Sequence, residues 1–183
     1  MPSFFITSST IMANQSFDFG LIGLGVMGRN LLLNMADHGF AVIGYNRSPQ
    51  KVTELESEIV PGTTVKGTSD LSLMVKELKT PRRIMMLVQA GKPVDDVLAE
   101  LIPLLDKGDI VIDGGNSHYT DTLRRVQYMQ EKGFHFMGVG VSGGEEGARR
   151  GPSIMPGGDK EAYPHVKPML EAVSAKVNGE PCV

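Results

Sequence analysis

The chain has 183 residues, of which 41% are hydrophobic and 21% are charged, and its formal net charge is −3. These values are typical of one globular domain, or of one domain with a small part of a second. No stretch concentrates Lys or Arg, which argues against a nucleic-acid or anionic-membrane partner. The single cysteine, Cys182, excludes an internal disulfide and fits a reducing cytoplasm.

The start of the chain carries neither of the usual targeting signals. Residues 1–28 contain no Lys or Arg, whereas a signal peptide needs a basic n-region and a mitochondrial presequence needs Arg. The apolar run Phe4-Phe5-Ile6 is too short to span a bilayer. We therefore expect a disordered leader over residues 1–16, a single domain over residues 17–183, and a cytoplasmic location.

From residue 17 onward, apolar runs of strand length alternate with helical patterns. The expected strands cover residues 17–22, 40–45, 63–66, 83–88, 109–113 and 134–137. The expected helices cover residues 27–38, a polar segment that begins at Pro49 after Ser48 as N-cap, and residues 94–105, 120–132 and 160–173. This alternation predicts an α/β domain with a Rossmann-type, doubly wound, mostly parallel sheet.

The first expected strand is followed by Gly23-Leu24-Gly25-Val26-Met27-Gly28, a Gly-x-Gly-x-x-Gly motif that opens a helix. This context is typical of dinucleotide binding. Gly23 would permit the tight turn, Gly25 would let the backbone approach a pyrophosphate, and Gly28 would allow close helix–strand packing. The helix N-terminus would add about half a positive charge toward the phosphates.

The second expected strand ends at Tyr45-Asn46-Arg47-Ser48, where no acidic residue occurs. A domain that prefers NAD has Asp or Glu at this place, about 20 residues after the glycines, to bind the ribose 2′-hydroxyl. The Arg47 guanidinium can instead bind a 2′-phosphate, with Asn46 and Ser48 adding neutral hydrogen bonds. The sequence therefore predicts NADP, unless Arg47 only decorates a solvated loop.

Two further polar segments follow expected strands, at the edge where open α/β sheets bind ligands. They are Val88-Gln89-Ala90-Gly91 and Asp113-Gly114-Gly115-Asn116-Ser117. The Asn116 amide offers donors and an acceptor, which suits a group between cofactor and substrate; an Asx-turn that caps the next helix is the alternative. The four histidines lack metal spacing, and no nucleophile–base arrangement can be argued.

Residues 138–158 hold eight of the chain's 22 glycines. Because Gly contributes no side chain to packing and loses much entropy on folding, this density predicts loops rather than a helix or strand. The backbone N–H groups of Ser142, Gly143 and Gly144 could line a nest for an anionic small molecule. Plain turns would explain the same glycines, and at least one of Glu145 and Glu146 is expected to pair with Arg149 or Arg150.

Several of these motifs belong to one family. The glycine motif with Arg-Asn-Leu after it, Asn-Arg-Ser at 46–48, Ile-Asp-Gly-Gly-Asn-Ser at 112–117 and the runs at 140–149 and 151–158 resemble the N-terminal domain of decarboxylating 6-phosphogluconate dehydrogenase. The resemblance covers roughly residues 17–183. It implies NADP-linked oxidation at C3 of 6-phosphogluconate, loss of CO₂, and ribulose 5-phosphate as product.

The resemblance also implies the site residues. Those implied for the cofactor are Gly23, Leu24, Gly25, Val26, Met27, Gly28, Asn46, Arg47, Ser48, Val88, Gln89, Ala90 and Asn116. Those implied for the substrate are Asn116, Ser142, Gly143 and Gly144. Many family members have Lys where this chain has Gln89. The missing charge would weaken binding of the cofactor phosphates, although a backbone contact would remain.

The family's catalytic groups have no counterpart in the chain. The general base is a Lys in a Lys-Met-Val-His-Asn-Gly-Ile-Glu-Tyr segment, a Glu proton donor follows it, and neither segment occurs here. We expect both beyond Val183, with the all-helical domain that builds the family's homodimer, so that the chain alone is catalytically incomplete. A 3-hydroxyacid dehydrogenase relative, or an NADP-binding module without catalysis, are the alternatives.

Overall fold

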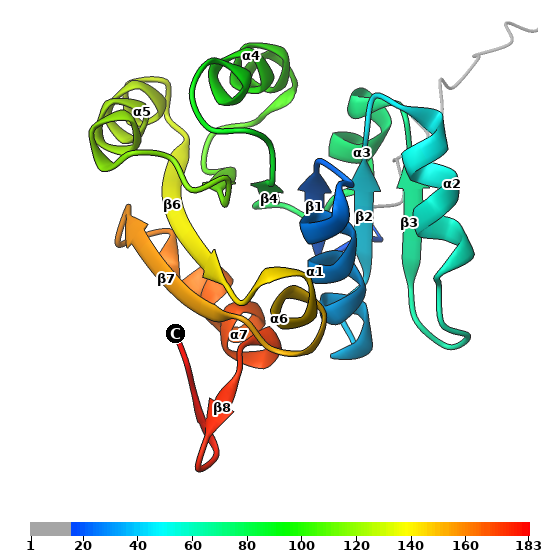
Figure 1. Ribbon diagram of the computed structural model, residues 1–183. Coiled ribbons are helices and arrows are strands. Elements are labelled where there is room, and N and C mark those ends of the chain that lie inside the picture. The colour runs from blue at the N-terminus through cyan, green and yellow to red at the C-terminus, as the bar shows by residue number, and fades with distance from the viewer. Residues whose placement is uncertain (1–15) are drawn as a thin grey trace, which may run out of the picture.

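A computed structural model describes residues 16–183, and its main feature is a seven-stranded sheet (Figure 1). The strands lie in the order β3-β2-β1-β4-β5-β6-β7, and all pair in parallel except the antiparallel β6–β7 pair. Their bounds are β1 Phe19–Ile22, β2 Val42–Tyr45, β3 Val65–Thr68, β4 Arg83–Met86, β5 Ile110–Asp113, β6 His135–Ser142 and β7 Ser153–Gly158. The predicted Rossmann-type, doubly wound sheet is confirmed.

Helices connect the strands, and a small hairpin follows the last helix (Figure 1). The helices are α1 Val26–Asp37, α2 Pro49–Ser57, α3 Leu71–Glu77, α4 Lys92–Leu101, α5 Tyr119–Glu131, α6 Gly144–Arg150 and α7 Tyr163–Val173. The hairpin pairs β8 Lys176–Val177 with β9 Glu180–Pro181. The helix expected over residues 94–105 ends at Leu101 and continues as a 3₁₀ turn, where Pro103 lacks the N–H that an α-helix needs.

The core lies on both faces of the sheet because successive strand residues point to opposite sides. In β4, Met85 belongs to the cluster with α1 and α7, while Ile84 and Met86 belong to the cluster with α3 and α4. Met85 and Met86 are both fully buried and fill the core. The expected leader over residues 1–16 lies outside the described residues except for Ser16, whose N–H donates to the Glu77 carbonyl at 2.9 Å.

The prediction of loops throughout residues 138–158 is wrong, because this segment contains part of β6, all of α6 and β7. Its glycines allow close packing of regular elements. A Cβ on Gly138 would lie 2.6 Å from Thr122 Cγ2 of α5, and one on Gly158 would lie 2.9 Å from the Phe136 carbonyl oxygen. The strands therefore use glycine where a neighbour leaves no room for a side chain.

Helix α3 was not predicted from the sequence. The helix has seven residues, too few for a clear helical period, and follows a short strand that begins at Val65, two positions later than expected. A local signal was present, since the Asp70 carboxylate caps the helix by accepting the Leu73 N–H at 3.0 Å.

Candidate functional site

Four loops meet at the carboxyl edge of the sheet, where β2, β1, β4 and β5 are neighbours. We call residues 23–25, 46–48, 87–91 and 113–117 the edge loops. The chain order reverses between β1 and β4, and such a switch point is where doubly wound sheets bind ligands. In Figure 1 the arrowheads of β1, β2 and β3 point to this edge, on the side where α4 and α5 lie.

The glycine motif turns sharply and packs against its neighbours. Gly23 has φ 99°, and a Cβ on it would lie 2.4 Å from the Leu87 carbonyl oxygen. A Cβ on Gly28 would lie 1.9 Å from the Gly23 carbonyl oxygen. The turn role of Gly23 and the packing role of Gly28 are confirmed. Gly25 differs, because no atom lies within 4 Å of where its Cβ would be, so the space beside it is open to a ligand.

The N-terminus of α1 is suited to an anion. The helix has Gly25 as N-cap, no side chain caps it, and no acidic residue occurs in its first turn. The first N–H groups of a helix have no partner inside it and carry partial positive charge. Val26 is exposed at this end, so a pyrophosphate can approach these groups directly.

Asn46 joins the loop after β2 to the glycine motif. Its side-chain oxygen accepts the Leu24 N–H at 3.0 Å, a structural role that the sequence did not reveal because the two residues lie 22 positions apart. Ser48 is the N-cap of α2 as predicted, with Pro49 in the first turn, although its hydroxyl makes no capping bond.

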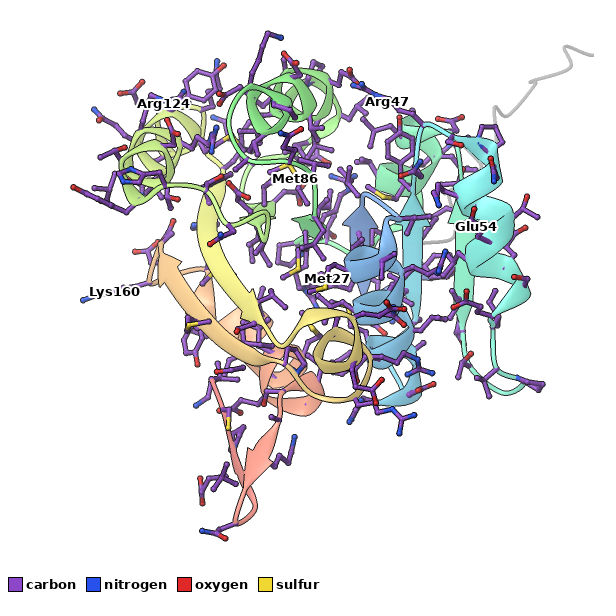
Figure 2. The ribbon with its side chains drawn as sticks, viewed as in Figure 1. Met27, Arg47, Glu54, Met86, Arg124 and Lys160 are labelled. Atoms are coloured by element: carbon purple, nitrogen blue, oxygen red, sulfur yellow. The ribbon has the colours of Figure 1, made fainter. Side chains whose placement is uncertain are left out.

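Arg47 lies at the end of β2 and is 63% exposed. Its Nη2 donates to Glu100 Oε1 of α4 at 2.5 Å, a contact that was not predicted. Both residues line a cavity of about 270 Å³ together with Gly23, Asn46 and Val88. Figure 2 shows Arg47 at this edge of the sheet, between α4 and α2. The Arg47 guanidinium therefore lies beside the glycine motif and pairs with the Glu100 carboxylate.

The loop after β4 contributes backbone and exposed side chains. Val88 lines the cavity of Arg47, while Gln89 and Ala90 are exposed. Gly91 ends the loop at φ 91° and is the N-cap of α4.

The loop after β5 is shaped by Asp113, which is buried. Its Oδ1 accepts the Gly115 N–H at 2.9 Å, so the Asx-turn belongs to Asp113. Asn116 is exposed at φ 61°, and His118, not Asn116, is the N-cap of α5. The alternative in which Asn116 caps this helix is wrong. Among residues 16–183 its side chain has no hydrogen-bond partner, which leaves the amide available to a ligand.

Asn116 lines a second cavity, of about 390 Å³, with residues of α5, β6 and β7. Ser142, Gly143 and Gly144 are exposed but do not line this cavity, because β6 continues well past Gly138, the partner of Asp113, before it reaches Ser142. Of these four residues, only Asn116 therefore lines this cavity. Their shared substrate role stays a prediction.

Comparison with known proteins decides the family. Residues 18–181 match a family model described as the NAD binding domain of 6-phosphogluconate dehydrogenase. The chain belongs to this family. The yeast relative named 6-phosphogluconate dehydrogenase, decarboxylating 1 is 54% identical over 92% of this chain, and the human relative is 57% identical over 90%. The chain spans 34% of the length of each, about a third.

Solved structures agree with this assignment. The Plasmodium falciparum 6-phosphogluconate dehydrogenase, solved in apo form, with its cofactor NADP⁺ and with its substrate 6-phosphogluconate, matches with TM-score 0.87 and 43% identity over 91% of this chain and 36% of its own. The Mycobacterium tuberculosis 3-hydroxyisobutyrate dehydrogenase matches with TM-score 0.75 and 22% identity over 87% of this chain and 53% of its own. At that identity the second likeness shows the fold alone.

Some other polar residues of this 6-phosphogluconate dehydrogenase domain form ordinary side-chain pairs. Glu146 pairs with Arg150 at 2.7 Å, as predicted for one of the two glutamates. His135 Nδ1 lies 2.6 Å from Asp159 Oδ2. Within residues 16–183, no three His, Cys, Asp or Glu side chains are grouped to hold a metal ion. No helix of that part of the chain is both long and apolar enough to cross a bilayer.

Proposed function

We propose that this chain binds NADP at the edge loops, as the cofactor-binding part of a decarboxylating 6-phosphogluconate dehydrogenase. The observation that carries the proposal is Arg47, exposed at the end of β2 with no acidic residue at positions 45–48. A planar guanidinium binds a phosphate through two parallel charge-assisted hydrogen bonds. The Plasmodium falciparum relative that was solved with NADP⁺ supports the same cofactor.

The contact between Arg47 and Glu100 does not oppose this role. The side chains are 63% and 49% exposed, and an exposed ion pair is worth about 0–1 kcal/mol. A 2′-phosphate carries more negative charge than one carboxylate, so it can replace Glu100 on the guanidinium. Glu100 then acts as a weak competitor that lowers the affinity for NADP without blocking the site.

Calorimetry with NADP and NAD on the 183-residue chain tests the cofactor. We expect tighter binding of NADP, and Arg47→Asp should reverse the preference, with a loss of at least about tenfold in NADP affinity because a charge-assisted bond is replaced by repulsion. Glu100→Gln should tighten NADP binding by up to about fivefold and leave NAD binding unchanged.

Arg150→Asp is the matched control, because it makes the same change of charge on α6, at an exposed position away from the edge loops. It should leave both affinities unchanged. Equal affinities of the unmodified chain for NADP and NAD would overturn the proposal.

The proposed reaction of the full-length enzyme is oxidation of 6-phosphogluconate and its decarboxylation to ribulose 5-phosphate and CO₂. The bound nicotinamide supplies the hydride acceptor, while Asn116 and Ser142–Gly144 contribute polar groups to the substrate. In a full-length enzyme that carries this domain, Ser142→Ala should raise the KM for 6-phosphogluconate about tenfold and leave NADP binding unchanged. An unchanged KM would remove Ser142 from the substrate site.

The chain alone should bind NADP without oxidising 6-phosphogluconate, because none of its Lys residues lies in the family's base motif. Loss of a positioned acid or base costs about 10²–10⁴-fold each. Absorbance at 340 nm measures NADPH formation, and sustained turnover would show that the catalytic groups lie within these residues. The homodimer and the cytoplasmic location implied by the family belong to this proposal for the full-length enzyme.

A further inference from the structure

Arg125 of α5 is fully buried, which is rare for Arg unless its charge is paired. All five of its N–H groups donate, as many as a guanidinium offers. Nε and Nη2 bind the two oxygens of Asp95 at 2.9 and 3.1 Å, and Nη2 also binds the Gly91 carbonyl at 3.0 Å. Nη1 binds Asp113 Oδ2 at 3.3 Å and Ser117 Oγ at 3.0 Å.

These partners lie on two edge loops. Gly91 ends the loop after β4, and Asp95 lies in the first turn of α4 that follows it. Asp113 is the last residue of β5, Ser117 is the last residue of the edge loop that begins there, and Ser117 Oγ donates to Asp113 Oδ2 at 2.6 Å. One guanidinium thus joins the loop that carries Gln89 to the loop that carries Asn116.

The two loops also touch each other directly. A Cβ on Gly115 would lie 2.3 Å from the Val88 carbonyl oxygen, so the backbones are in contact with no room for a side chain. Since Asp113 Oδ1 holds the Gly115 N–H at 2.9 Å, a shift of Asp113 would move Gly115 and, with it, Asn116 and Val88. The position of Asn116 therefore depends on the group that holds Asp113.

We propose that Arg125 is a positioning residue of the cofactor site, which fixes the loops at 87–91 and 113–117 so that Val88, Gln89 and Asn116 meet the ligand in a ready-made arrangement. The inference rests on the proposed function for the identity of the ligand, NADP. Loops that already have the binding geometry do not have to be ordered when the ligand binds. Less binding free energy is therefore lost, and the affinity is higher.

The ion pair between Arg125 and Asp95 keeps both residues in their charged forms. Burial acts to lower the pKa of Arg125, but the hydrogen bonds and charge of Asp95 raise it above its ordinary value. The hydrogen bond from Arg125 in turn lowers the pKa of Asp95. Lys cannot replace this arrangement, because an ammonium has three donors and lacks the planar fork.

Two other arginines provide matched controls. Arg124 lies on the same helix (Figure 2) and is 54% exposed. It also binds Asp95, but it forms no hydrogen bond with Asp113 or Ser117. Arg82 is buried and joins the same strands at their amino ends, where its Nη1 donates to Asp109 at 2.7 Å. A purely structural role of Arg125 would resemble that of Arg82.

The test compares Arg125→Lys, Arg82→Lys and Arg124→Lys in the 183-residue chain. Chemical denaturation measures stability, calorimetry measures NADP binding to the folded fraction, and backbone amide spectra without ligand measure loop structure. Arg125→Lys should weaken NADP binding by about 10- to 100-fold. It should also shift the ligand-free amide signals of Val88, Gln89, Gly115 and Asn116.

In contrast, Arg82→Lys should lose stability but bind NADP within about twofold of the unmodified chain, and Arg124→Lys should change neither property strongly. If Arg125→Lys does not fold, Ser117→Ala, which removes one partner of Arg125 and Asp113, should show the same loop shifts and a smaller loss of affinity.

The inference is overturned if Arg125→Lys, or Ser117→Ala in its place, leaves the ligand-free loop signals unchanged. It is also overturned if Arg125→Lys and Arg82→Lys weaken NADP binding equally. Failure of the unmodified chain to bind NADP would instead overturn the proposed function, and the ligand-free spectra would still decide whether Arg125 positions the loops.

Discussion

The two ends of the β4–β5 strand pair are each joined by a buried arginine, and they differ in what the arginine contacts. At the amino ends, Arg82 binds Asp109 and the Val75 carbonyl, next to the strands themselves. At the carboxyl ends, Arg125 binds two loops that carry the exposed Gln89 and Asn116. A buried ion pair by itself therefore does not identify a ligand site. What identifies one is a position at the carboxyl edge of the sheet.

Breaking the Arg82–Asp109 ion pair at the amino ends of β4 and β5 should have the largest effect on stability. Arg82→Met leaves the buried Asp109 carboxylate without its cation, and removing one partner of a buried pair costs about 3–5 kcal/mol. Urea unfolding should show a loss of this size, whereas the fraction that stays folded should keep its NADP affinity. A loss below about 1 kcal/mol would mean that the pair contributes little to the fold.

Two substitutions in the glycine motif should separate an effect on stability from an effect on NADP binding. A Cβ on Gly28 meets the Gly23 carbonyl, so Gly28→Ala should destabilise the chain by about 1–3 kcal/mol, as overpacking does. Gly25 has open space around it, so Gly25→Ala should change stability by less than about 1 kcal/mol.

Gly25→Ala should nevertheless weaken NADP binding, because the added methyl group occupies the space through which a pyrophosphate approaches α1. Thermal unfolding and calorimetry on both variants check the two effects. Unchanged affinity in Gly25→Ala would show that the ligand does not lie on the glycine motif.

The smallest effect concerns acid stability at the carboxyl edge. The pKa of Asp95 is lowered in the folded chain, mainly by its hydrogen bond with Arg125, so its contribution to stability is present above the ordinary carboxyl pKa of about 4. This contribution is lost as the pH falls through the lower pKa of the folded state. Because Asp95 is 39% exposed, solvent screens the interaction and the effect is modest.

Asp95→Asn should therefore flatten the decrease in unfolding free energy below about pH 4. Asp96→Asn is the control, since Asp96 pairs with the exposed Lys92. Denaturant titrations over this pH range measure both variants, and an identical acid slope in the two would contradict the role given to Asp95.

The sequence predicted the elements whose residues follow a local pattern. Six strands and five helices were found close to their expected positions, and Gly23, Gly28 and Ser48 have the predicted backbone roles. The glycines of residues 138–158 were misread because each serves a neighbour that is distant in the sequence, such as Thr122 beside Gly138.

In the candidate site, too, local features could be predicted from the sequence and contacts between distant residues could not. The place of Arg47 just after the second strand follows from the local pattern of the sequence. Its contact with Glu100 spans 53 positions, and that of Arg125 with Asp95 spans 30, so no local pattern could reveal them. Asn46 likewise needs the β1–β2 pairing to reach Leu24. Pairings of this kind exist only once the sheet order is known.

The central claim is that the carboxyl edge of the sheet, and not the amino edge, binds NADP. Titration of NADP into the isotope-labelled 183-residue chain, followed by backbone amide signals, tests it most directly. We predict shifts at Gly25, Arg47, Gln89 and Asn116, with the signals of Arg82 and Asp109 unchanged. Shifts confined to the amino edge, or none at saturating NADP, would contradict the account.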